Sequence, residues 1–152
     1  MRAVLKNLDE VRRHHEFFLA LNEREMNTAL DVSGRVATRF VQTFPRFTPR
    51  TGKTQKATKH RVIRSRGGRL MLFTNTSKHA GVLESGSRPH VIRVRSRNHL
   101  RFKGREGKFV FRESVRHPGT KPYRFMSSAY SAGNAYFKSD MQRRMTAIAS
   151  RF

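Results

Sequence analysis

Seven histidines are the first side chains in this sequence to consider for chemistry, because an imidazole can bind a metal or transfer a proton. His14 and His15 are adjacent, so on a helix they point to different sides. The other five lack the i, i+4 spacing that places two imidazoles on one helix face. Cysteine is absent, which excludes disulfides and thiolate-bound metals. The sequence therefore predicts no metal site.

Carboxylates are scarce in the part of the chain where hydrolytic chemistry would need them. A general acid or base needs a second acid, a histidine or a metal as its partner. In the region of predicted strands only Glu84, Glu106 and Glu113 are available. We therefore expect no enzymatic activity, no catalytic residue and no cofactor. Glu84 is expected to be a structural partner of Arg88 or of an arginine on a neighbouring subunit.

Basic residues dominate the composition and give the chain a formal net charge of +23. Six of the ten acids lie in the first 31 residues, and none lies between Val32 and Leu83. Such a stretch suits phosphates, although a merely solvated face is the alternative. We expect the basic segments 45–69 and 93–105 to face double-stranded DNA without sequence preference. The candidates are Arg46, Arg50, Lys53, Lys56, Lys59, Arg61, Arg64, Arg66, Arg69, Arg93, Arg95, Arg97, Arg101, Lys103 and Arg105.

The elements that must position these residues begin with helices. Asn7 and Asn22 each precede a glutamate by three residues, which predicts a short helix over about 8–20 and then a longer one. Pro45 should end the second helix. Its apolar stripe is expected to consist of Met26, Ala29, Leu30, Ser33, Val36, Ala37, Phe40 and Phe44.

Residues 45–58 combine prolines, a glycine and positive charges, which predicts an exposed basic loop. Short runs rich in strand-forming residues follow and predict an antiparallel meander of about four to five strands. The runs are 59–65, 69–75, 79–84, 90–95 and 107–113, with 96–107 as a second exposed basic loop.

A helix of about 25 residues is predicted after Pro122 and should pack on the sheet. Gly133 is expected to weaken its middle. The length of 152 residues and the order of elements predict one α+β domain spanning 1–152. No run of about 18 apolar residues exists, so no membrane span is expected. The apolar face should carry Met126, Tyr130, Phe137, Met141, Met145, Ile148 and Phe152.

Two tetrapeptides repeat one pattern, Gly86-Ser87-Arg88-Pro89 and Gly119-Thr120-Lys121-Pro122. Glycine, a hydroxyl and proline are typical of turns, and neither sequence has the spacing of a nucleotide-binding P-loop. We expect these turns to lie near each other or at a subunit boundary. The interface candidates are Glu84, Gly86, Arg88, Pro89, His90, Arg116, His117, Pro118, Gly119, Lys121 and Pro122.

Five features occur in order along almost the whole chain. They are Leu5-Lys6-Asn7-Leu8-Asp9-Glu10, the helix ending at Pro45, Thr48-Pro49-Arg50-Thr51-Gly52, Ala80-Gly81-Val82-Leu83-Glu84-Ser85-Gly86-Ser87-Arg88-Pro89-His90, and Val115-Arg116-His117-Pro118-Gly119-Thr120-Lys121-Pro122 followed by Phe125. In this combination the sequence resembles the small tail-component family of long-tailed, siphovirus-type bacteriophages, whose members are neck or tail-completion proteins.

The resemblance implies a non-enzymatic virion protein, assembled in the host bacterial cytoplasm. It implies a homo-oligomeric ring, about a hexamer, at the joint between the head connector and the tail. The expected partners are the head-closure protein, the tail terminator or tube protein, and packaged duplex DNA. Two alternatives stay open: a tail terminator that caps the tail tube and, more distantly, a cellular nucleic-acid-binding protein.

Overall fold

The computed structural model describes residues 8–66, 68–95, 98–104 and 106–150. These residues form two compact units. The described residues up to Ser77, together with those from Phe125 onward, make the first unit, and those within Lys78–Arg124 make the second. Helices and antiparallel strands occur together, so the expected α+β class is confirmed.

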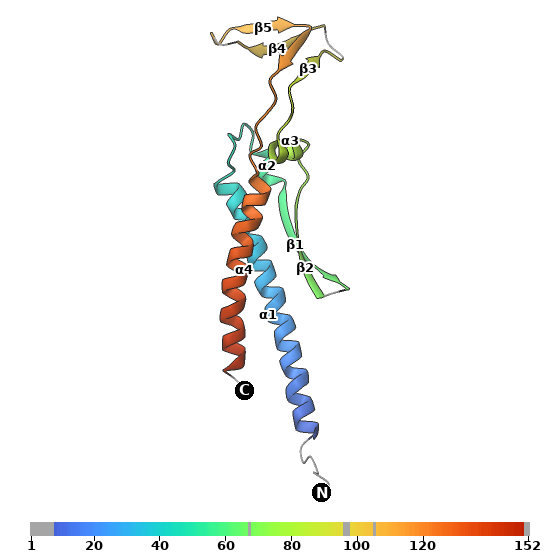
Figure 1. The fold of residues 1–152 in the computed structure, drawn as a ribbon, viewed down its shortest axis with the longest axis vertical. Coiled ribbons are helices and arrows are strands. Elements are labelled where there is room, and N and C mark those ends of the chain that lie inside the picture. The colour runs from blue at the N-terminus through green and yellow to red at the C-terminus, as the bar shows by residue number, and fades with distance from the viewer. Residues whose placement is uncertain (1–7, 67, 96–97, 105, 151–152) are drawn as a thin grey trace. The chain divides into compact units, whose positions relative to one another are not determined.

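Two long helices, α1 (Leu8–Thr43) and α4 (Phe125–Ala149), lie side by side in the first unit (Figure 1). The Ser33 hydroxyl donates a hydrogen bond of 2.8 Å to the Gly133 carbonyl across their contact. A Cβ at Gly133 would lie 2.9 Å from the Ser33 carbonyl oxygen, so the glycine allows this close approach. At four-residue steps, α1 buries Ala29, Ser33, Ala37 and Val41, and the first half of α4 buries Phe125, Ala129 and Gly133. Further along, α4 also buries Asp140 and Ile148.

The predicted break between two N-terminal helices is wrong, because α1 continues without interruption through Asn22. Asn22 caps nothing, and its side-chain oxygen is buried without a hydrogen-bond partner. Glu25, the expected capping glutamate, instead accepts a hydrogen bond from Arg144 of α4. Packing along α4 therefore keeps the chain helical where the local pattern favoured a new start. Asn7 lies outside the described residues.

A hairpin of β1 (Thr58–Ser65) and β2 (Gly68–Asn75) packs on α1, as the sequence predicts for both strands. The side chain of His60 packs against Gly34 of α1, where a Cβ would overlap the imidazole. Thr38 donates to the Gly34 carbonyl at 2.8 Å and lies 2.9 Å from His60 Nδ1. His60 is therefore a packing residue that joins strand and helix.

The predicted loop 45–58 is more ordered than expected, since it contains the short helix α2 (Lys53–Lys56) and the buried first residue of β1, Thr58. The Asn75 side chain donates to the Thr54 carbonyl and to the Thr58 hydroxyl, each at 2.7 Å. These hydrogen bonds tie the end of the loop to β2.

The second unit contains α3 and four short strands. Residues 79–84, predicted as a strand, belong largely to a helix, so that prediction is wrong; a short apolar run has no periodicity that separates the two states. The expected continuous meander is replaced by separate two-stranded ladders, β3 with β6 and β4 with β5. The bounds are α3 Ala80–Ser85, β3 His90–Arg93, β4 Leu100–Lys103, β5 Phe109–Arg112 and β6 Ser114–His117.

Two strands fall outside the predicted runs. β4 lies within residues 96–107, which we expected to form a loop, and β6 follows β5 after a bend at Glu113. β4 pairs with the nearby β5, whereas β6 pairs with β3, a partner that the local sequence does not reveal. In the first unit, Phe44 and Tyr130 were expected in the apolar stripes, but they are 64% and 52% exposed. Near Tyr130 the buried positions of α4 are instead Ala129 and Gly133, which are small enough to allow close approach to α1, whereas Ile148 is buried as predicted.

Candidate functional site

The two repeated tetrapeptides meet in the second unit, which confirms that they lie near each other. Ser87 and Thr120 form an antiparallel bridge, in which each N–H donates to the other carbonyl at 2.9 and 3.0 Å. Gly86 and Gly119 both have positive φ, 76° and 90°. A Cβ on either glycine would overlap the backbone of the opposite turn. The two turns therefore cross each other at close range, and this crossing requires glycine at both positions.

His90 and His117 continue this crossing as a paired position of β3 and β6. Their ring centroids are 5.0 Å apart. His90 Nδ1 donates to the Arg88 carbonyl at 2.8 Å, whereas His117 Nδ1 accepts the Gly119 N–H at 3.1 Å. Both rings therefore brace the turns. Within the described ranges no group of three His, Cys, Asp or Glu side chains is placed to hold a metal.

The crossing presents cations around its outside. Arg88, Arg116 and Lys121 are exposed. Glu84 is half-buried, and its carbonyl accepts the Arg124 N–H at 3.3 Å. Of the remaining interface candidates, four are exposed, namely Pro89, His90, Pro118 and Pro122. The other three, Gly86, His117 and Gly119, are half-buried. Contact of this surface with another subunit stays a prediction.

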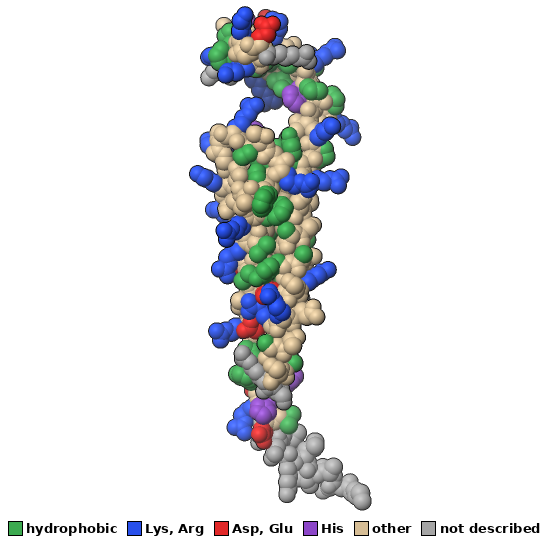
Figure 2. Space-filling view, turned by 90° about the vertical axis from the view of Figure 1, so that its left-hand side faces the viewer, with side chains coloured by type: hydrophobic (Ala, Val, Ile, Leu, Met, Phe, Trp, Pro, Cys, Tyr) green, Lys and Arg blue, Asp and Glu red, His purple; other side chains and the backbone are tan. Residues whose placement is uncertain are grey.

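Basic side chains project from the first unit over several elements (Figure 2). Lys59 and Arg61 alternate with the side chains of β1 that face α1, so they lie on the outward face of the hairpin. Arg46, in a left-handed conformation with φ 59°, donates to the Ser128 hydroxyl of α4. The other exposed candidates of this unit are Arg50, Lys53, Lys56, Arg64 and Arg66.

Arg64 and Arg69 differ from the other candidates because both bind one carboxylate. Their guanidinium groups donate to the same Glu23 oxygen, at 3.1 and 2.6 Å. These hydrogen bonds, the one from Arg69 first, lower the pKa of Glu23. The carboxylate offsets part of the local positive charge, so this pair is less available to phosphates than the rest. The acid that compensates them lies more than forty positions away in the sequence, and no local pattern points to it.

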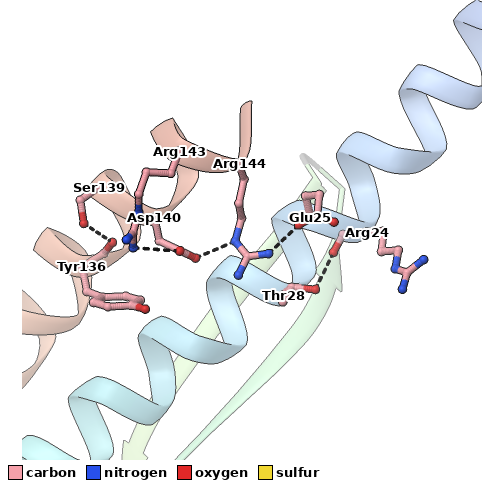
Figure 3. A network of polar contacts seen from close by, with 8 residues as sticks. All are labelled: Arg24, Glu25, Thr28, Tyr136, Ser139, Asp140, Arg143 and Arg144. Carbon is pink, nitrogen blue, oxygen red and sulfur yellow. Dashed lines mark hydrogen bonds and ion pairs between the residues drawn. The ribbon is translucent and has the colours of Figure 1, made fainter. Parts of the chain in front are cut away.

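A second charge cluster joins the two long helices (Figure 3). Arg144 donates to Asp140 at 2.7 Å and to Glu25 of α1 at 2.5 Å, and Arg143 donates to Asp140 at 3.2 Å. The hydrogen bond to Asp140 is the largest cause of the raised pKa of Arg144. Asp140 is only 7% exposed, so its charge requires these partners. The cluster therefore connects the two helices through Asp140, Arg144 and Glu25.

In the second unit, Arg93 and Arg95 are exposed at and just after β3, and Arg101 and Lys103 are exposed on β4. Arg97 and Arg105 lie outside the described residues. Sequence reasoning missed the rings beside these cations, Phe109 and Phe111. The Phe-Val-Phe alternation of 109–111 is the signal that places both rings on one face of a strand.

The comparisons with known proteins give no assignment: no family model, no curated protein and no solved structure matches the chain. Among the described residues no helix is both long enough and apolar enough to span a membrane.

Proposed function

We propose that this chain is a non-enzymatic virion protein of the head-tail joint of a long-tailed bacteriophage, a neck or tail-completion protein. It forms a homo-oligomeric ring that joins the tail to the head connector. The proposal begins from the ordered sequence features that resemble the small tail-component family. The structure adds physical support for assembly.

The observation that carries the proposal is that every strand in the described part of the chain pairs along one edge only. Two-stranded sheets are marginal by themselves, and their free edges are templates for pairing with another chain. Large apolar side chains are also exposed, such as Phe44 at 64% and Val11 at 65%. A subunit of this kind gains stability when neighbours cover free strand edges and these apolar side chains.

The positive charge of the chain also suits the proposed ring to contact DNA. The candidate cations described in the structure are exposed except for Arg69, which is half-buried. A net charge of +23 destabilises an isolated chain through self-repulsion, and a polyanion offsets it. Packaged duplex DNA passing through the ring supplies such a polyanion, and contact with its phosphates needs no sequence recognition.

The proposal is tested by the assembly state and by the phenotype of a phage that lacks this gene. We expect the purified protein to form rings by electron microscopy, alone or with its connector partner. We expect the deletion to leave DNA-filled heads and separate tails of normal length. Tails of uncontrolled length would instead identify a tail terminator. A protein that stays monomeric with phage connector and tail proteins, and whose gene is dispensable for particle joining, would contradict the proposal.

A further inference from the structure

The β4–β5 hairpin of the second unit carries two cationic side chains and two aromatic rings on one of its faces. The register pairs Arg101 with Phe111 and Lys103 with Phe109. Directly opposed residues of an antiparallel pair share a face. The β4 strand therefore contributes a row of cations and the β5 strand a parallel row of rings. The opposite face carries Leu100, Phe102, Val110 and Arg112.

All four side chains of this cation-ring face are accessible. Phe109 is 50% exposed and Phe111 is 55% exposed, and Arg101 and Lys103 are exposed as well. The guanidinium carbon of Arg101 lies 3.8 Å from the centroid of the Phe109 ring. The face thus offers two stacking platforms: the Phe111 ring, and the Arg101 guanidinium supported by Phe109.

We propose that this cation-ring face binds single-stranded DNA, with unpaired bases stacking on Phe111 and on the Arg101 guanidinium that covers Phe109, and with the sugar-phosphate backbone following the cations of β4. Aromatic rings and arginine planes stack on any base, and this tolerance needs no sequence motif. Successive same-face residues of a strand are about 6.8 Å apart. That repeat is comparable to the step between consecutive phosphates of an extended single strand.

Charge and ring placement favour this ligand over the alternatives. The phosphates of duplex DNA would pair with Arg101 and Lys103, but the bases of a duplex are stacked on one another. The aromatic rings would then have no exposed base to stack on. An acidic protein surface would likewise use the cations and leave the ring row without a matching partner. The choice of DNA over RNA rests on the proposed function. The preference for an unpaired strand rests only on the stacking surface of the hairpin.

The experiment measures binding of the full-length protein to a labelled oligothymidylate and to a blunt duplex of equal length. The variant F109L/F111L keeps apolar bulk but removes both rings. We expect it to lower affinity for the single strand by about tenfold or more, and to change duplex affinity by less than about twofold. The matched control F102L makes the same substitution on the opposite face of the hairpin, where Phe102 is 39% exposed. It should change neither affinity.

A second variant keeps the test decisive if the leucine variant loses its fold. F109Y/F111Y retains two stacking rings and should bind the single strand within about twofold of the original chain. Equal losses for single strand and duplex, no loss in F109L/F111L, or an equal loss in F102L would overturn the stacking site. Ring assembly of each variant is followed separately by electron microscopy, so failure of this site is distinguishable from failure of the proposed function.

Discussion

Gly86 and Gly119 each lie against the backbone of the other's turn. A side chain at Gly86 would overlap the Thr120 carbonyl oxygen, and a side chain at Gly119 would overlap that of Ser87. The repeated tetrapeptides therefore form a single interlocked element.

Replacing Gly119 by alanine should break this crossing. The new Cβ would overlap the Ser87 carbonyl and would also strain a backbone with φ 90°. Gly107→Ala is the matched control, because Gly107 has φ 75° but open space around a Cβ. We expect Gly119→Ala to destabilise the second unit by about 2 kcal/mol more than the control. Amide hydrogen exchange at Ser87 and Thr120 measures the difference, and equal protection in both variants would refute the interlock.

The contact between α1 and α4 should be sensitive to one methyl group at Gly133. Alanine favours a helix by about 1 kcal/mol over glycine, but its Cβ would lie 2.9 Å from the Ser33 carbonyl and 3.0 Å from the Ala37 side chain. The atom nearest to the new Cβ belongs to the backbone and cannot move aside easily. We therefore expect Gly133→Ala to destabilise the first unit by about 1 kcal/mol or more. Urea unfolding tests this, with exposed Ser131→Ala on α4 as control. A more stable Gly133→Ala variant would show that the helices separate easily.

Acid should weaken the attachment of the β1–β2 hairpin to α1. Arg69 and Arg64 lower the pKa of Glu23 from its ordinary value of 4.5. The ion pair therefore stabilises the fold above that value, and its contribution is lost as the pH falls through the lowered pKa. Urea midpoints measured from neutral pH downward should show Glu23→Gln less stable at neutral pH and equal to the original chain in acid. Glu16→Gln, at an exposed position of the same helix, is the matched control and should leave the urea midpoint at neutral pH unchanged.

Binding of duplex DNA should depend on the exposed cations near α2. Replacing Arg50, Lys53, Lys56 and Lys59 by serine should flatten the dependence of log K on log salt by about 0.9 for each phosphate that the variant no longer binds. Replacing Arg64 and Arg69 should flatten it less per residue, because Glu23 already offsets their charge. Titrations at several salt concentrations give both slopes. An unchanged slope in the first variant would remove these four residues from the DNA-facing set.

Local sequence determined those features that need no distant partner. The C-terminal helix is predicted from the three- and four-residue spacing of apolar residues after Pro122, β1 and β2 from two adjacent runs separated in the sequence by Gly67-Gly68, and the α+β class from the order of the elements. The excess of Lys and Arg likewise ensures a basic surface, because there are too few acids to neutralise it and charged side chains stay exposed.

Other features depend on residues that are far apart in the chain, so they are visible only in the tertiary structure. Asn22 stays inside α1 because α4 packs alongside, although its local pattern favours a cap. β6 exists because it pairs with β3, and Arg69 differs from its basic neighbours because Glu23 of α1 faces it. Local propensities differ by about 1 kcal/mol or less per residue, so a packed helix or a ladder of hydrogen bonds overrides them.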